Sequence, residues 1–215
     1  MPLAGRPMVE WSIAALRAAP SVGAIVVACP PGHAHGLGGD GLAVVEGGAT
    51  RARSVSNALA AVDAEVVAIH DAARPLLTPE LVEGVLATLS SDPGAAGAIA
   101  ATPVTDTVKR AAPRGGASPD PPAGGAGGEG GPRPAVESTL DRARLWAAQT
   151  PQAFRLAALR EALAGDPERV AAATDEASPV EAAGGRVLIH PSPPGNLKVT
   201  TPLDLRLAEL LLAQR

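Results

Sequence analysis

The run Glu65-Val-Val-Ala-Ile-His70 is short and apolar, and the polar turn Asp71-Ala-Ala-Arg-Pro75 and a helix start at Thr78-Pro79-Glu80 follow it. Continuous apolar runs are typical of strands buried on both faces of a parallel sheet. Thr is a favoured N-cap residue, Pro suits the first helical position, and an acid suits the first turn. The stretch therefore predicts a strand, a turn and a helix, which is the repeating unit of an α/β fold.

The same alternation continues on both sides of this stretch. Residues 23–29, 42–46 and 97–102 are further apolar runs. The segment after Arg51 carries an apolar stripe at helical spacing, and Thr201-Pro-Leu-Asp204 repeats the helix start signal. We therefore predict a doubly wound, mostly parallel, Rossmann-like α/β sheet in a single domain over residues 1–215. In such sheets ligands bind beyond the carboxyl ends of the strands.

Composition and charge exclude several classes of protein. The chain has 215 residues, 24 Gly and 22 Pro, no Tyr, and three other aromatic residues, Trp11, Trp146 and Phe154. Few aromatic residues and a net charge of -4 argue against nucleic-acid binding, which needs stacking platforms and a basic excess. One cysteine, Cys29, excludes an intrachain disulfide and a Cys-rich metal site. With neither an apolar run of membrane-spanning length nor a signal-peptide pattern, a cytoplasmic protein without membrane contact is expected.

Residues 111–134 interrupt the α/β pattern with a Gly- and Pro-rich stretch that has almost no side chain to bury. Residues 105–110 and 135–140 on either side alternate as strands do. We predict a projecting β-hairpin arm over residues 105–141, with a disordered tip. A projecting hairpin has little core of its own, which predicts an oligomer.

Candidate binding groups follow the predicted strands. Asp71 could hold a divalent cation or a ribose hydroxyl, and Arg74 could clamp a phosphate, although a turn cap with a local ion pair is equally common. Gly47, Gly48 and Ser54 lie at a helix start that could bring backbone N–H groups toward an anion or a base, or form a simple turn.

Lysine is rare in this chain, which makes both of its positions informative. There are 16 Arg but only Lys109 and Lys198. Lys198 lies beside Pro-Pro-Gly and just before a capped helix, where a compact ammonium could bind phosphate. Thr174-Asp175-Glu176 is most simply a helix cap, and His70 most simply a core histidine. The chain has no nucleophile–base pair, zinc motif or Rossmann glycine fingerprint.

Eight fragments in order resemble the 2-C-methyl-D-erythritol 4-phosphate cytidylyltransferase family. They are Pro2-Leu-Ala-Gly-Arg-Pro7, Gly47-Gly-Ala-Thr-Arg51, His70-Asp-Ala-Ala-Arg-Pro75, Asp106-Thr-Val-Lys109, Asp141-Arg142, Thr150-Pro-Gln152, Thr174-Asp-Glu-Ala-Ser178 and Asn196-Leu-Lys-Val-Thr-Thr-Pro202. The resemblance implies transfer of a cytidylyl group from CTP to methylerythritol phosphate, releasing pyrophosphate, in non-mevalonate isoprenoid synthesis. It implies a nucleotidyltransferase fold, Mg²⁺ carried mainly by the CTP phosphates, no metal site built by the protein, and a homodimer joined through the arm.

The resemblance also assigns roles to residues. Arg142 and Lys198 would hold and aim the attacking phosphate, and Gly47, Gly48 and Ser54 would lie against the cytosine. The remaining substrate and ribose contacts would come from Asp71, Arg74, Thr107, Thr150 and Thr174. Because the family's arm crosses to a second subunit, Arg74, Thr107 and Arg142 would serve the neighbouring site. The tip is longer than in the family, so we expect deletion of residues 113–131 to leave turnover nearly intact.

One departure concerns the amino terminus. The family begins with a strand and a glycine-rich loop whose Arg and Lys grip the triphosphate, and Met1 stands where that loop ends. We expect the sequence to be an N-terminally truncated form of the enzyme, poorly active as written. The alternatives are a cytidylyltransferase for another polyol phosphate, such as ribitol 5-phosphate, and a non-catalytic dimeric nucleotide-binding relative.

Overall fold

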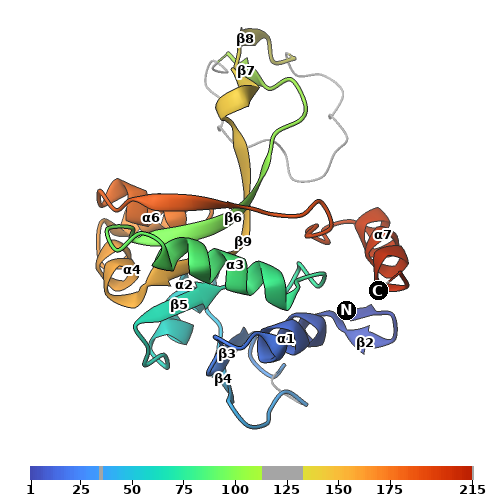
Figure 1. The fold of residues 1–215 in the computed structure, drawn as a ribbon. Helices are drawn as coiled ribbons and strands as arrows, with labels where there is room; N and C mark the ends of the chain where they lie inside the picture. Colours follow the sequence, from blue (N-terminus) through green and yellow to red (C-terminus); the bar gives the residue numbers. More distant parts are fainter. Residues whose placement is uncertain (34–35, 113–132, 215) are drawn as a thin grey trace. The chain divides into compact units, whose positions relative to one another are not determined.

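The computed structural model describes residues 1–33, 36–112 and 133–214 (Figure 1). The chain divides into two compact units. The core unit consists of Met1–Thr102 and Ala148–Arg215, and the arm unit is Pro103–Ala147. Each is described by itself below.

Ten strands are found in the described residues. In chain order they are β1 (Pro2–Leu3), β2 (Arg6–Pro7), β3 (Ile25–Cys29), β4 (Leu42–Glu46), β5 (Val66–Ile69), β6 (Gly97–Pro103), β7 (Lys109–Ala111), β8 (Val136–Thr139), β9 (Trp146–Arg155) and β10 (Val187–Pro191).

Helices follow most of these strands. They are α1 (Met8–Ala18), α2 (Arg51–Leu59), α3 (Pro79–Ser90), the 3₁₀ helix η1 (Arg142–Arg144), α4 (Leu156–Leu163), α5 (Pro167–Ala172), α6 (Ala177–Ala182) and α7 (Pro202–Leu212). Side-chain caps explain three of the starts, because Thr50, Thr78 and Thr201 each accept a backbone N–H at the first turn of α2, α3 and α7. The Thr201 cap is a full capping box with Asp204.

The strands of the core unit pair in separate sheets. A four-stranded sheet has the order β10-β6-β9-β5, with β10 and β6 parallel and β5 and β9 antiparallel. β3 and β4 form a parallel pair of their own, and β1 and β2 a short antiparallel one. The four apolar runs predicted as strands correspond to β3, β4, β5 and β6, so that prediction is confirmed.

Helices cover both faces of the four-stranded sheet, which is the doubly wound arrangement (Figure 1). Along β6, Ala98 and Ala100 pack in a cluster with α1 and α3, whereas Ile99 packs in a second cluster with α2, α4 and α6. On β9, Ala153 and Phe154 separate in the same way. Successive side chains of a strand point to opposite faces, so both faces are apolar and the runs read as continuous. The predicted α/β class is confirmed.

Two strands of the sheet were absent from the sequence prediction. β9 mixes polar and apolar residues, contains Pro151 after a cis peptide bond, and spans the end of the arm unit and the start of the next core segment. β10 is short and only partly buried. Neither has the uninterrupted apolar run by which the other strands were recognised. Yet β9 lies in the middle of the sheet and carries Phe154, a completely buried side chain.

A third apolar cluster joins the two ends of the chain. Leu3 of β1 packs with Leu76, Val199 and Ala208 of α7, and Figure 1 shows the two termini close together. Among the described residues, no helix has the length and apolar character needed to cross a membrane.

The arm unit is an antiparallel hairpin of β7 and β8, as predicted, with Lys109 paired to Thr139. The first strand begins at Lys109 instead of residue 105, although the carbonyl of Val108 still accepts the N–H of Leu140 at 3.0 Å. None of the described residues in this unit is buried. The predicted tip, residues 113–131, lies outside the described residues.

Candidate active site

The candidate site lies where polar residues follow the strands of the core unit. Asp71 comes just after β5, and Gly47 and Gly48 come directly after β4. Arg51, the first residue of α2, connects these two segments, because its Nη2 lies 3.3 Å from Oδ1 of Asp71. The two loops predicted to bind ligand are therefore neighbours, although β4 and β5 belong to different sheets.

Four charged residues form a continuous chain of ion pairs. Lys198 Nζ lies 3.0 Å from Oδ2 of Asp71, whose other oxygen faces Arg51. Arg51 in turn grips Glu176 with both terminal nitrogens, Nη2 donating to Oε2 at 2.8 Å. Glu176 is buried, whereas the Lys198 side chain is 45% exposed. Two cations and two anions balance, so Lys198 can neutralise a phosphate fully only by releasing Asp71.

The pKa directions agree with this arrangement. Burial raises the pKa of Asp71, but the hydrogen bond from Lys198 and the charge of Arg51 outweigh it and bring the pKa below its ordinary value. Burial also raises the pKa of Glu176, and here the bonds from Arg51 only partly offset the effect. Asp71 is therefore an anion at neutral pH, held by two cations.

The loop from Gly47 to Ser54 is tied together by its own hydrogen bonds. Gly47 donates its N–H to the carbonyl of Cys29 at 2.7 Å, and Gly48 donates its N–H to Oγ of Ser54 at 3.0 Å. A Cβ on residue 48 would lie 2.2 Å from Cγ of Arg53 and 3.1 Å from its carbonyl carbon, so only glycine fits. The hydroxyl of Ser54 also donates to the carbonyl of Thr50 at 3.0 Å. Ser54 thus shapes the predicted nucleobase loop.

Arg74 is a buried guanidinium without a carboxylate partner in the part of the chain that is described. Its Nη1 donates to the carbonyl of Asn196 at 2.8 Å, and its Nε has no hydrogen-bond partner there. Burial lowers the pKa of Arg74, and Asp71 partly offsets this. The side chain of Asn196 donates to the carbonyl of Thr150 at 2.9 Å and to Oε1 of Gln149 at 2.9 Å. Asn196 therefore links Arg74, β9 and the segment that carries Lys198.

Thr150 lies on β9 and is buried. Its hydroxyl accepts the backbone N–H of Asp71 at 3.0 Å and lies 3.2 Å from Nδ1 of His70. His70 is partly buried and hydrogen-bonded on both ring nitrogens, in agreement with its interpretation as a satisfied core histidine.

The other predicted residues are placed differently. Thr174 is exposed, and Oδ1 of Asp175 accepts the N–H of Ser178, in the first turn of α6, at 3.1 Å. The stretch Thr174-Asp175-Glu176, interpreted as a helix cap, contributes this hydrogen bond through Asp175. A substrate contact by Thr174 stays a prediction. Thr107 and Arg142 belong to the arm unit, where both are exposed and Arg142 Nη1 donates to the carbonyl of Thr105. Their roles at the site stay predictions.

Three residues at the site were not assigned from sequence. They are Arg51, which binds Asp71, Glu176, which binds Arg51, and Asn196, whose carbonyl accepts a hydrogen bond from Arg74. Each lies within a fragment quoted for the family resemblance, so the signal was present. Sequence reasoning passed over them because helix starts, helix caps and turns also account for an Arg, a Glu and an Asn.

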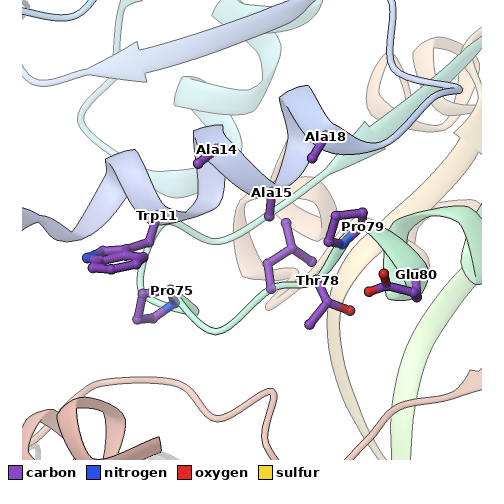
Figure 2. Close-up of a pocket in the computed structure, with 9 residues that line it drawn as sticks. Trp11, Ala14, Ala15, Ala18, Pro75, Thr78, Pro79 and Glu80 are labelled. Atoms are coloured by element: carbon purple, nitrogen blue, oxygen red, sulfur yellow. The ribbon is translucent and has the colours of Figure 1, made fainter. Parts of the chain in front are cut away.

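A separate hollow lies between α1 and the start of α3, with a cavity volume of about 470 Å³ (Figure 2). It is lined mainly by apolar side chains, including Trp11 and Ala15 of α1 and the ring of Pro79. None of the predicted site residues lines it. The charged cluster around Asp71, rather than this hollow, is therefore the candidate site.

The carboxylates of the candidate site face cations of the protein. Among the residues that the structure describes, no three His, Cys, Asp or Glu side chains come together as a metal site. Asp71 is the carboxylate nearest to Lys198, and both of its oxygens face cations. The donor set around Asp71 is thus arranged for ion pairing with fixed cations.

The doubly wound fold, with a cluster of fixed cations beyond the strand ends, defines a nucleotidyltransferase-like α/β protein. Residues 1–118 and 128–214 match the family model described as IspD, 2-C-methyl-D-erythritol 4-phosphate cytidylyltransferase. The chain belongs to this family.

Relatives and solved structures agree with the assignment. The chain is 45% identical to a bifunctional enzyme IspD/IspF of Anaeromyxobacter sp. (strain Fw109-5), over 98% of this chain and 51% of that protein. It is 41% identical to the 2-C-methyl-D-erythritol 4-phosphate cytidylyltransferase of Bordetella petrii, over 96% of this chain and 86% of the relative. The crystal structure of the enzyme from Thermus thermophilus matches with a TM-score of 0.76 and 34% identity, over 99% of this chain and 92% of that one. The chain spans about half the length of the bifunctional relatives.

Proposed function

We propose that this chain carries the cytidylyltransferase activity of its family, joining the cytidylyl group of CTP to 2-C-methyl-D-erythritol 4-phosphate and releasing pyrophosphate. The observation that carries the proposal is the Lys198–Asp71–Arg51 arrangement beyond the end of β5. It provides an exposed ammonium for phosphate beside an anchored carboxylate that can accept hydrogen bonds from ribose hydroxyls.

The reaction needs no nucleophile from the protein. A phosphate oxygen of the polyol phosphate forms a bond to the α-phosphorus of CTP, and the bond from that phosphorus to the bridging oxygen breaks, so pyrophosphate leaves with the electron pair. The protein's part is positioning and neutralisation of charge. Lys198 would exchange Asp71 for the attacking phosphate, since its charge is otherwise spent on the carboxylate.

The nucleotide loop supports the same proposal. Gly48 lacks a side chain where a Cβ would meet Arg53, and the carbonyl of Gly48 receives no strong internal bond, the contact from Ser54 Oγ being 3.5 Å long. A backbone carbonyl can accept a hydrogen bond from the amino group of cytosine. Uracil has a carbonyl at that position and cannot donate, so this contact would favour cytosine. Arg51 would keep this loop and Asp71 at a fixed separation.

Magnesium enters this proposal as part of the substrate. We propose that Mg²⁺ arrives bound to the CTP phosphates, since the carboxylate nearest Lys198 is committed to cations. Metal addition to the chain alone should then have little effect on its thermal stability, whereas metal with CTP should stabilise it.

The arm is proposed to join two copies of the chain. Its hairpin has no buried residue among those described, and Val136 is 64% exposed. A two-stranded hairpin is marginal alone, so a partner surface would stabilise it. Through this dimer, Thr107 and Arg142 would reach the partner subunit's site. Light scattering of the chain with and without residues 105–141 tests the proposal: a mass of one chain in both cases would contradict it.

The decisive experiment measures pyrophosphate release with CTP and methylerythritol phosphate, using a form of the protein that also carries the family's N-terminal glycine-rich loop. Lys198→Ala should reduce turnover by at least about a hundredfold, because a charge-assisted phosphate contact is lost in the transition state. Arg206→Ala, which removes an exposed cation on α7, is the matched control and should leave turnover unchanged. Unchanged turnover in Lys198→Ala would refute its role.

Two alternatives are decided by the same assay. Faster turnover with ribitol 5-phosphate than with methylerythritol phosphate would identify the other polyol phosphate as substrate. Binding of CTP without pyrophosphate release from either acceptor would indicate a non-catalytic nucleotide-binding relative.

A further inference from the structure

The imidazole of His70 occupies a position between β9 and the turn that carries Asp71 and Arg74. Its Nε2 lies 3.1 Å from the carbonyl oxygen of Arg74, and its Nδ1 lies 3.2 Å from Oγ1 of Thr150. The same Thr150 oxygen is 3.0 Å from the backbone nitrogen of Asp71. One ring therefore reaches both ends of the turn, directly at Arg74 and through one hydroxyl at Asp71.

The chemistry of the partners fixes where the protons lie. A carbonyl oxygen can only accept, so Nε2 of His70 must carry a proton and donate it to Arg74. In a neutral ring Nδ1 is then an acceptor, and the hydroxyl of Thr150 supplies its proton. The oxygen of Thr150 keeps lone pairs to accept the N–H of Asp71. In this series of hydrogen bonds, Asp71 donates to Thr150, Thr150 donates to His70, and His70 donates to Arg74.

The surroundings keep this ring neutral. Burial lowers the pKa of His70 from 6.5 to about 4, an effect that Asp71 opposes and Arg74 reinforces. Across the physiological range Nδ1 is therefore free to accept, and the order of donors stays the same. A protonated ring would donate at both nitrogens and reverse the Thr150 hydroxyl.

From this geometry we infer that His70, as the neutral Nε2–H tautomer, is a positioning residue for the proposed transfer reaction, aligning Asp71 through Thr150 and Arg74 through its carbonyl. The inference rests on the proposed function for its kinetic consequence alone. It also gives Thr150 a different role from direct substrate contact, since its single proton is already donated to the ring. The turn is further fixed by the N–H of Arg74, which donates to the carbonyl of Asp71 at 2.9 Å.

Three single substitutions in the full chain, and one double variant, separate positioning from direct contact. Thr150→Ser keeps the hydroxyl, and Thr150→Val replaces it with a methyl group of similar shape. His70→Gln can still donate to the Arg74 carbonyl but has nothing at the Nδ1 position. We combine the last two in a double variant.

The expected kinetic result is a shared loss. Thr150→Val and His70→Gln should each lower kcat/KM by roughly 10- to 100-fold, because each leaves a group of the donor sequence unpaired. The kcat/KM of the double variant should be no more than about threefold below that of the less active single variant, since both substitutions act through the same hydrogen bonds. The kcat/KM of Thr150→Ser should stay within about threefold of the parent value. If Thr150 instead contacts the substrate directly, His70→Gln should have a nearly normal kcat/KM. That result would overturn the inference. So would a double variant whose loss in kcat/KM is the product of the two single losses, or a Thr150→Ser variant with a large loss.

Two measurements test the inference without activity. Nitrogen-15 NMR of the histidine ring should show a protonated Nε2 and a bare Nδ1 at pH 7; an Nδ1–H tautomer or a charged ring would overturn it. The Asp71 amide should be protected from hydrogen exchange in the parent and in Thr150→Ser, and exposed in Thr150→Val. Equal protection in all three would refute the bond to Thr150. If the chain releases no pyrophosphate while both measurements hold, the proposed function fails and the positioning geometry stands.

Discussion

The core unit and the arm unit differ in the interactions that stabilise each of them. In the core unit, Phe154 and Leu159 are completely buried, and the candidate site residues are bonded to one another across β9, α2 and the loop before α7. In the arm unit, no described residue is buried, and the bonds are those of a short hairpin, such as Lys109 to Thr139 at 2.8 Å. The core unit is thus stabilised by buried side chains, whereas the described part of the arm has only the hydrogen bonds of its hairpin.

The difference extends to the predicted functional groups. Asp71 and Arg74 are held in place by neighbours within the core unit. Arg142 of the arm is exposed and contacts only its own unit in the hydrogen bonds found. Fixed groups can be preorganised for a transition state, which is what charge neutralisation requires. Groups on an exposed hairpin acquire a fixed position only through what the hairpin docks against.

The largest difference between the units is expected in the loss of stability when one apolar side chain is truncated in each of them. Phe154→Ala should lower the free energy of unfolding by about 3–5 kcal/mol, because it empties the centre of a packed cluster. Val136→Ala, at a position that is 64% exposed, should change it by no more than about 0.5 kcal/mol. Urea denaturation followed by circular dichroism measures both. Similar losses in the two variants would show that the arm shares the core's stability.

A second test concerns the pH dependence of the core unit. The pKa of His70 is about 4 in the folded chain and 6.5 in its ordinary state. Between these two pH values His70 is therefore protonated in the unfolded chain and neutral in the folded chain. Stability from this group is complete above about pH 6.5 and is lost as the pH falls toward 4, by at most about 3 kcal/mol. His70→Gln should flatten this part of the curve.

The comparison with the variant is needed because other groups titrate nearby. Glu176, whose pKa is raised by burial, contributes in the opposite direction, and Asp71, whose pKa is lowered, contributes below the usual carboxyl range. The measurement is the difference in unfolding free energy between the parent and His70→Gln at each pH. A difference that does not change between pH 6.5 and 4 would contradict the folded-state pKa.

The smallest effect is expected at the tip of the arm. Deleting residues 113–131, which lie outside the described residues, should change the free energy of unfolding by less than about 1 kcal/mol, because the entropy of closing the connection between two strands changes only slowly with its length. Turnover in the pyrophosphate assay should stay nearly intact. A large loss of turnover with unchanged stability would assign the tip a part in catalysis or in the dimer.

Much of the fold could be predicted from local patterns. The apolar runs of β3, β4, β5 and β6 mark strands because both of their faces are buried, and threonine caps followed by proline mark the starts of α3 and α7. β9 escaped prediction because its apolar residues are concentrated at one end, and its place beside β5 depends on pairing with a segment more than eighty residues away.

The residues of the candidate site could be named from the sequence, whereas most of their contacts could not. Asp71, Arg74, Thr150 and Lys198 were named from turns and from the family resemblance, and the structure brings them together. No local pattern indicates that Arg51 reaches Glu176, 125 positions away in the sequence. Nor does a local pattern indicate that His70 is hydrogen-bonded to Thr150, or that the carbonyl of Asn196 accepts a hydrogen bond from Arg74.

By itself, the sequence determined the α/β class, the family and most of the residues that would handle phosphate, since strand burial, helix capping and side-chain chemistry are local properties. Tertiary structure alone decided which of those residues are already paired. Lys198 is held by Asp71, Asp71 by Arg51, and the turn from Asp71 to Arg74 by His70 and Thr150. The physical reason is that a charge or a proton is assigned by its neighbours in space, and folding chooses those neighbours from distant parts of the chain.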